Sequence, residues 1–514
     1  MSYSIEKITQ VVSAERYGDT AASISFLLTD SRSLCFPEET LFFALHTDRN
    51  DGHHYIPELY RRGVRNFVVE NVPNNFSDLY KHANFLKVGN TLAAFQQLAT
   101  FHRKAFNIPI VGITGSNGKT MVKEWLSQLF SYDMNVTRSP KSYNSQIGVP
   151  LSLWLLNENS QIGLIEAGIS KVGEMQALHD IIMPTVGVLT SIGTAHQENF
   201  SSLKEKCNEK LLLFKGTQAL IYRIDDKIAA KCVAETCYDG ELLAWSEHDT
   251  TAAFYVERIE KSNTTSTIHY IWKHSTHGNF ILPFIDDASI SNCITCAVVA
   301  LYFGMQPEVL AQRMVKLEPV AMRLEVKEGQ HGCTLINDSY NSDINSLNIA
   351  LDFMNRRPDQ KHRERTLILS DIYQSGETEE QLYAEVAAMV KERGIKKFIG
   401  VGKALNRQKQ AFGSLKDKFF FENTADFIES NVFKTLHNEV ILLKGARVFD
   451  FDKLTELLVK KVHETVLEVN LNAVISNLNW YRSFLKPETK LVCMIKADAY
   501  GAGAVEIAKT LQEH

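Results

Sequence analysis

A glycine-rich loop between an apolar run and an amphipathic helical pattern constrains the fold of this chain more than any other feature. The run IPIVGIT (108–114) is followed by GSNGKT and by the helical pattern KTMVKEWLSQLF (119–130). Strand, tight turn and helix in this order open an α/β unit. The backbone N–H groups of such a loop and the helix N-terminus bind phosphate oxygens. We therefore expect a nucleotide-binding α/β domain here.

The loop residues have separate roles in this prediction. Gly115 and Gly118 let the backbone approach phosphate, Lys119 supplies positive charge, and the Thr120 hydroxyl can bind Mg²⁺. The spacing departs from the usual G-x-x-x-x-G-K-[ST], because Ile113 stands where the first glycine is expected. The alternative is a glycine-rich turn that carries an incidental lysine. The residues expected to contact ATP are Gly115, Ser116, Asn117, Gly118, Lys119 and Thr120.

Composition narrows the class of protein. A chain of 514 residues suggests about three or four domains. The 55 Lys and Arg against 60 Asp and Glu leave a charge of -5, which argues against nucleic-acid partners. No apolar run approaches the roughly 20 residues of a membrane span, and the first residues lack the layout of a signal peptide. The eight scattered cysteines form no disulfide framework, so we expect a cytoplasmic protein without a membrane span.

Periodicity divides the chain into four segments. Residues 1–107 mix short strands with amphipathic helices. In 108–318, apolar runs alternate with helical stretches, and a Thr- and Ser-rich patch at 263–267 indicates a hairpin. Residues 319–462 contain four more apolar runs between helical segments, as in a separate α/β domain. Residues 463–514 restart as strand, helix and strand, and are too few to bury a core alone.

Three residues downstream of the loop are candidates for a metal site. Glu166 ends the apolar run GLIEAG, a position from which a carboxylate reaches a phosphate-bound Mg²⁺. His196 follows another apolar run, and Lys210 lies 14 residues further on in a helical pattern. Each also has an ordinary explanation, such as a turn histidine or a solvent-exposed helix lysine. The residues alone indicate an ATP- and Mg²⁺-dependent enzyme and leave its substrate open.

Taken in order, several blocks resemble the Mur ligases, the ATP-dependent amino-acid ligases of peptidoglycan synthesis. They are GITGSNGKT, YNSQIGVP, IEAG, SIGTAHQENF, AMRLE, NDSYNSDINSL and LLKGAR. The resemblance implies a small α/β N-terminal domain that binds a UDP-sugar (1–107), a P-loop ATPase central domain (108–318) and a Rossmann-like C-terminal ligase domain (319–462). The opening TDSR…LFFAL…DGH (29–53) and the YNSDINSL block resemble the members that join D-alanyl-D-alanine to UDP-N-acetylmuramoyl-tripeptide.

The resemblance also implies a role for individual residues. The catalytic set would be Lys119, Glu166, His196, Lys210 and Arg323. The Mg²⁺ ligands would be Thr120, Glu166, His196 and Lys210, the last as a carbamate, which turns a cation into an oxygen ligand. Further ATP contacts would come from Asn144, Asn292, Arg323, Asp338 and Asn341. The UDP-sugar would be bound by Asp30, Ser31, Arg32, Asp51, Gly52 and His53.

Two other functions stay open. A folylpolyglutamate-type ligase shares the ATPase core, although it would lack the DSR…DGH first domain. A nucleotide-gated binding protein without chemistry would share the phosphate loop. The pair Cys293 and Cys296 has the C-x-x-C spacing of a zinc or redox site, but it has no second pair and lies in an apolar helical run. We expect these two cysteines to belong to the core.

The last segment indicates the start of a different enzyme. KLVCMIKADAYGAG (490–503) carries a lysine at the end of an apolar run, where catalytic residues of β/α barrels lie. The segment resembles the N-terminus of alanine racemase, with Lys496 as the pyridoxal-phosphate lysine and Tyr500 in the same loop. The alternative is an ordinary strand-terminal lysine. A racemase would need roughly 300 more residues, so we expect pyridoxal phosphate only in a complete fusion.

Overall fold

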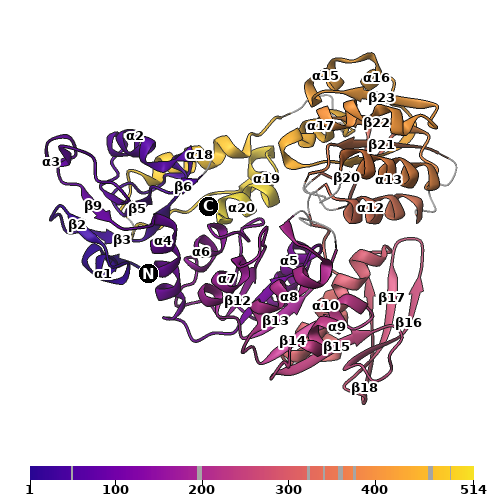
Figure 1. Ribbon diagram of the computed structural model, residues 1–514, viewed down its shortest axis with the longest axis horizontal. Helices are drawn as coiled ribbons and strands as arrows, with labels where there is room; N and C mark the ends of the chain where they lie inside the picture. Colours follow the sequence, from indigo (N-terminus) through magenta and orange to yellow (C-terminus); the bar gives the residue numbers. More distant parts are fainter. Residues whose placement is uncertain are drawn as a thin grey trace.

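The computed structural model describes residues 1–47, 50–193, 199–320, 324–339, 342–356, 363–373, 378–460, 467–486 and 488–513. Its larger sheets build successive α/β units along the chain, coloured from indigo to orange in Figure 1. Each of these sheets lies within one of the predicted segments, whose boundaries stay predictions. Among the described residues, no helix is both long enough and apolar enough to cross a bilayer.

The N-terminal unit is built on a mostly parallel sheet. Its strand order is β2 (Glu15–Tyr17), β9 (Asn84–Lys87), β8 (Asn66–Val69), β5 (Thr40–Phe43) and β4 (Phe26–Leu28). Only β2 among these runs antiparallel to its neighbour. Phe43 packs with α1 (Ile5–Val11) and α4 (Thr91–Arg103), whereas the adjacent Phe42 packs with α2 (Ile56–Arg61). This alternation is the period of two expected of a strand buried on both faces.

The central unit contains the phosphate loop. Its strand order is β11 (Val136–Arg138), β12 (Ile162–Glu166), β10 (Ile110–Thr114), β13 (Val186–Leu189), β14 (Ala219–Arg223), β15 (Glu241–Ser246), β16 (Phe254–Lys261), β17 (Ser266–Trp272) and β18 (Thr276–Leu282). Pairing is parallel from β11 to β16 and antiparallel from β16 to β18. The patch 263–267 falls at the β16–β17 turn, which confirms the predicted hairpin. β10 lies between β12 and β13, a crossover point at whose carboxyl end ligands bind in such sheets.

Helices cover both faces of the central sheet. One layer is formed by α5 (Lys119–Phe130), α10 (Asp287–Tyr302) and α11 (Pro307–Met314), the other by α6 (Gly148–Leu153), α7 (Glu174–Ile182), α8 (Leu203–Leu211) and α9 (Lys227–Glu235). The bounds of α5 are those predicted from sequence. Cys293 and Cys296 are fully buried in α10 against this core, which confirms their structural role.

The third unit is another mostly parallel sheet. Its strand order is β19 (Glu325–Glu328), β20 (Thr334–Asp338), β24 (Glu439–Lys444), β21 (Glu364–Ser370), β22 (Lys397–Val401) and β23 (Asp417–Phe421). α12 (Ile344–Arg356) and α13 (Glu379–Glu392) cover one face, and α15 (Thr424–Glu429) and α17 (Phe451–Leu458) cover the other. The four predicted apolar runs correspond to β20, β21, β22 and β24.

The C-terminal segment, yellow in Figure 1, contains α18 (Leu471–Arg482), α19 (Lys496–Gly501) and α20 (Ala504–Glu513). α18 packs on α20, and Lys509 Nζ of α20 lies 3.5 Å from Glu318 Oε2 of the central unit. The helix of the predicted strand–helix–strand is present, but the predicted strands are wrong: 467–470 and 488–495 form no strand. A barrel strand is stabilised by hydrogen bonds to strands on each side, and the described residues provide none for this segment.

Candidate active site

The phosphate loop (115–118) connects β10 to α5 at the carboxyl edge of the central sheet. Gly115 and Gly118 have φ angles of 148° and 88°, which glycine adopts readily. A Cβ at Gly118 would lie 2.4 Å from Asn292 Oδ1, so the loop approaches α10 more closely than a larger residue permits. The loop thus has the glycine conformations expected of a phosphate loop, and the predicted approach of its backbone to phosphate stays a prediction.

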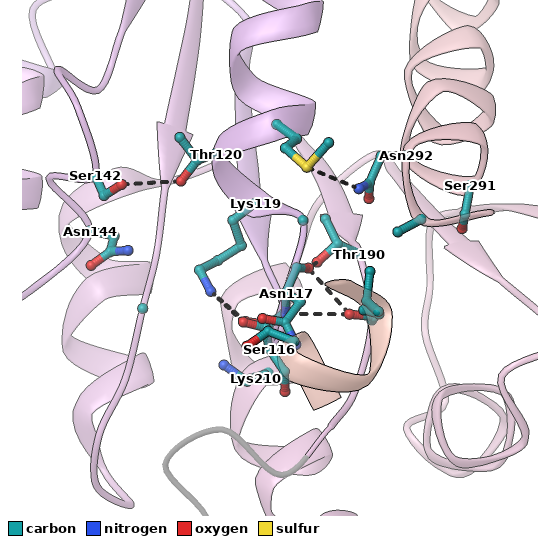
Figure 2. Close-up of a pocket in the computed structure, with 18 of the residues that line it drawn as sticks. Ser116, Asn117, Lys119, Thr120, Ser142, Asn144, Thr190, Lys210, Ser291 and Asn292 are labelled. Carbon is teal, nitrogen blue, oxygen red and sulfur yellow. Dashed lines mark hydrogen bonds between the residues drawn. The ribbon is translucent and has the colours of Figure 1, made fainter. Parts of the chain in front are cut away.

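Hydrogen bonds fix the loop before any phosphate binds. The Ser116 N–H donates to Ser191 O at 2.7 Å, just beyond β13. Lys119 Nζ donates to Gly115 O at 2.8 Å and to Ser116 O at 3.1 Å, and Figure 2 shows it lying over the loop. From this position the ammonium can turn to a phosphate oxygen without a change in the backbone.

A cluster of oxygen atoms lies beside the loop, at the start of α5 and the end of β12. Thr120 Oγ1 is 3.3 Å from Glu166 Oε2 and 3.1 Å from Ser142 Oγ. Asn144 Nδ2 is 3.5 Å from the same Glu166 oxygen, and the Glu166 side chain is fully buried. Carboxylate and hydroxyl oxygens are ligands that Mg²⁺ prefers. The predicted ligands Thr120 and Glu166 therefore fit a divalent cation.

Lys210 lies in the last turn of α8 and lines the same cavity (Figure 2). Only 4% of this lysine is exposed. Burial lowers the pKa of Lys210 well below its usual value, and the positive charges of Lys119 and Lys206 lower it further. Lys210 is thus not the solvent-exposed helix lysine of the simpler interpretation. Its neutral amine is the form that can attack an electrophile such as CO₂.

The loop, Lys210 and three residues of the oxygen cluster, Thr120, Ser142 and Asn144, line one cavity of about 520 Å³ between the central and third units. The third unit lines it with Leu324, Asp338, Ser346 and Ile349. Asp338 Oδ2 accepts a hydrogen bond from Lys444 Nζ at 2.7 Å, and both side chains are buried. Asn292 of the central unit also lines the cavity, and its Nδ2 lies 3.7 Å from Met121 Sδ. The predicted ATP contacts Asn144, Asn292 and Asp338 therefore meet in this cavity.

Three predicted site residues cannot be placed. His196, Arg323 and Asn341 lie outside the described residues. Their predicted roles, as a metal ligand for His196 and as ATP contacts for Arg323 and Asn341, stay predictions.

The predicted UDP-sugar residues form two turns of the N-terminal unit. Asp30 accepts a hydrogen bond from the Arg32 N–H and pairs with its guanidinium at 2.6 Å. Asp51 Oδ1 lies 2.6 Å from His53 Nδ1, and His53 Nε2 accepts from the Glu70 N–H at 3.1 Å. Both ring nitrogens of His53 are thus used internally. Arg32, with its side chain 87% exposed, can still reach a ligand.

The predicted pyridoxal-phosphate residues lie in an exposed turn. Lys496 and Tyr500 are both exposed in α19, and the Lys496 ammonium is 5.9 Å from the Tyr500 ring centroid. Residues 497–500 have left-handed φ angles of 51–58°, which are unfavourable for residues other than glycine. The described residues around Lys496 form no barrel and no enclosed cofactor site.

Sequence reasoning missed three residues of the site. Lys123 is fully buried beside Glu166, Ser142 contacts Thr120, and Lys444 pairs with Asp338. Lys444 is the first residue of the KGAR block, which carries the resemblance to the Mur ligases but implied no role for this lysine. The burial of Lys123 could have been expected from its spacing in the helix. It lies three residues before Leu126 and seven before Phe130, which places it on the apolar face of α5.

This fold and site define a multidomain protein of the P-loop nucleotide-binding class. The family described as Mur ligase middle domain matches residues 113–300, and the one described as Mur ligase, glutamate ligase domain matches 322–447. The chain belongs to the Mur ligase family. Residues 469–514 match the alanine racemase N-terminal domain, as the sequence predicted.

Curated relatives span most of the chain. UDP-N-acetylmuramoyl-tripeptide–D-alanyl-D-alanine ligase of Bacillus subtilis is 28% identical over 385 residues, covering 73% of this chain and 79% of the relative. The enzyme of the same name from Buchnera aphidicola is 25% identical and covers 90% of this chain and 99% of the relative.

Solved structures share the fold. MurF from Acinetobacter baumannii superposes with a TM-score of 0.76 at 20% identity, covering 89% of this chain and 99% of the other. MurF from Thermotoga maritima in complex with ADP superposes with a TM-score of 0.69 at 20% identity, covering 84% of this chain and 96% of the other. The three-domain α/β architecture predicted from sequence is thereby confirmed.

Proposed function

We propose that this protein is an ATP-dependent ligase that joins D-alanyl-D-alanine to UDP-N-acetylmuramoyl-tripeptide. The observation that carries the proposal is the cavity between the central and third units. It is lined by a phosphate loop, by Thr120, whose hydroxyl lies 3.3 Å from Glu166 Oε2, and by the buried Lys210, whose pKa is lowered by burial. These groups suit phosphoryl transfer to a carboxylate. The names of the curated relatives supply the substrates.

The reaction runs in two steps. A carboxylate is a poor electrophile, so an oxygen of the tripeptide's terminal carboxylate attacks the γ-phosphorus of ATP, and ADP leaves. The product is an acyl phosphate. The amine of D-alanyl-D-alanine then attacks the acyl carbon, a tetrahedral intermediate forms, and it collapses to amide and inorganic phosphate as the amine loses a proton. The cavity must hold both substrates in line for these displacements.

The residues of the cavity supply positioning and charge. The backbone of the phosphate loop would bind the β- and γ-phosphates, and Lys119 would turn from Gly115 O towards the transferring phosphate. Thr120 and Glu166 would bind Mg²⁺, which neutralises charge on the phosphates when present. Asp338 would contact the ribose from the third unit. Because the nucleotide then touches both units, closure of one on the other gates the reaction.

Lys210 completes this proposal as a carbamate. Its nitrogen adds to CO₂ and loses a proton, which forms an N–C bond and leaves a carboxylate-like group. This reaction needs a neutral amine, and burial together with Lys119 and Lys206 favours that form. The product carries negative charge among lysines, which stabilises it. His196 and this carbamate would together bind a second Mg²⁺, apart from the one bound by Thr120 and Glu166.

Phosphate release tests the proposal. Release should require ATP, the UDP-muramoyl-tripeptide and D-alanyl-D-alanine together, and Lys119→Ala should abolish it. Release that instead follows folate and glutamate would favour the folylpolyglutamate-type alternative. Binding of ATP with no release under any substrate combination would favour a nucleotide-gated binding protein. The relatives act in the synthesis of peptidoglycan precursors, and we place the reaction in the cytoplasm, as the sequence predicted.

A further inference from the structure

A second lysine of α5 has no role in the proposed chemistry and yet is completely buried. Lys123 is one turn beyond Thr120. Its Nζ donates hydrogen bonds to Ser139 O at 2.8 Å and to Lys141 O, and it lies 3.2 Å from Glu166 Oε1. A second carboxylate, of Glu124, is 2.8 Å from the same ammonium. Burying a charge this completely is unfavourable unless it is paired and hydrogen-bonded, so these contacts define the site.

The contact between Lys123 and Glu166 gives the two Glu166 oxygens different surroundings. Oε1 faces Lys123 and has no other hydrogen-bond partner among the described residues. Oε2 lies 3.3 Å from the hydroxyl of Thr120, a residue that lines the cavity. An ion pair on one oxygen fixes the rotation of the carboxyl group, which points the other oxygen at the place where Mg²⁺ would bind.

The same ammonium holds the loop that forms the other side of the oxygen cluster. Ser139 and Lys141 accept from it through their carbonyls, and Lys141 has a left-handed φ of 51°. Ser139 Oγ also accepts from the Glu166 N–H at 3.1 Å. The loop then continues to Ser142, whose hydroxyl is 3.1 Å from Thr120 Oγ1. One buried charge therefore connects both sides of the cluster.

We propose that Lys123 is a positioning residue for the metal–nucleotide complex: it orients Glu166 and fixes the loop 139–142, so that Thr120, Ser142 and Glu166 Oε2 face one point. Lys123 itself does not line the described cavity. The inference rests on the proposed role of Glu166 in binding Mg²⁺. It differs from a merely structural role, in which Lys123 would stabilise the fold and leave the affinity for metal unchanged.

Nucleotide binding measured with and without metal separates the two roles. ADP affinity is determined by calorimetry in EDTA and in Mg²⁺ for the wild type and Lys123→Met, with Lys231→Met, an exposed lysine of α9, as the matched control. For Lys123→Met we expect metal-free ADP affinity within about threefold of wild type and a loss of at least about tenfold in the strengthening caused by Mg²⁺. Lys231→Met should match the wild type. Equal weakening with and without Mg²⁺, or a lower melting temperature alone, would overturn the proposal.

Two further measurements keep the test decisive. In a Glu166→Gln background, Lys123→Met should cause little additional loss of Mg²⁺ strengthening, because both changes act through one group. If Lys123→Met does not fold, a crystal structure of the wild type with Mg²⁺ and ADP distinguishes the positioning role of Lys123 from a merely structural one. Glu166 should keep Oε1 on Lys123 and bind metal through Oε2; a carboxylate turned away from Lys123 would refute the role. None of these experiments uses the peptide substrates, so failure here is distinguishable from failure of the proposed ligase activity.

Discussion

Lowering the pH should destabilise the junction between the N-terminal and central units, because a buried histidine lies there in its neutral form. His102, near the end of α4, is only 1% exposed. Its Nδ1 is 2.9 Å from the Tyr3 hydroxyl and its Nε2 is 3.0 Å from Leu156 O, so Nε2 carries the proton and Nδ1 accepts. The ring also packs on Trp154, with centroids 4.5 Å apart. A second proton on Nδ1 would require the Tyr3 hydroxyl to turn its own proton away, and burial opposes the charge of the imidazolium.

The size of the effect follows from the pKa. Burial lowers the pKa of His102 to about 4, from an ordinary value of 6.5. As the pH falls, the unfolded chain therefore takes up the proton first, and stability present above about pH 6.5 is lost progressively towards pH 4. The difference corresponds to a loss of about 2 kcal/mol at pH 5 and at most about 3 kcal/mol below pH 4.

Urea unfolding measures this loss in the free energy of unfolding. The wild type and His102→Phe are compared at pH 7.5 and 5.0 by tryptophan fluorescence. The variant leaves Leu156 O without its donor and should be less stable by about 1–3 kcal/mol at pH 7.5. It lacks the titrating group, so its deficit should shrink by about 2 kcal/mol at pH 5.0. The exposed His437→Asn serves as the control and should follow the wild type. A deficit that stays constant between the two pH values would refute the reasoning.

Three other outcomes can be checked. Lys210→Ala should lose most ligase turnover and regain part of it with added formate or acetate, and full activity of that variant in CO₂-free buffer would exclude the carbamate. Asp338→Asn removes the negative charge paired with the buried Lys444 ammonium and should lower stability by about 3–5 kcal/mol; an unchanged melting temperature would show that the pair contributes nothing. This chain should not racemise alanine with added pyridoxal phosphate, because Lys496 lies in an exposed turn. Racemisation clearly above a Lys496→Ala control would contradict that expectation.

Local pattern was enough to predict the central unit. β10 occupies residues 110–114 of the run 108–114, α5 occupies the pattern 119–130, and Glu166 ends β12 as expected. In each case the strand or helix favoured by the local sequence is also the element that the sheet and its covering helices require at that place. The phosphate loop followed directly, because the positive φ angles of its glycines belong to the local turn between strand and helix.

Contacts between distant segments could not be predicted in this way. Lys123 and Lys210 are lysines on amphipathic helices, and their burial depends on strands and loops far away in the sequence. The segment 490–495 has the apolar pattern of a barrel strand, yet it forms no strand without neighbouring strands. Periodicity reports which face of an element is apolar, and it does not report what covers that face.

Isotope transfer tests the central claim most directly. The UDP-muramoyl-tripeptide is prepared with ¹⁸O in its terminal carboxylate and incubated with ATP, Mg²⁺, D-alanyl-D-alanine and the enzyme, and the inorganic phosphate is analysed by mass spectrometry. The account predicts one ¹⁸O atom in phosphate for each amide bond formed, because the carboxylate oxygen leaves with the phosphoryl group. Amide formation with unlabelled phosphate, or phosphate release without the dipeptide product, would contradict it.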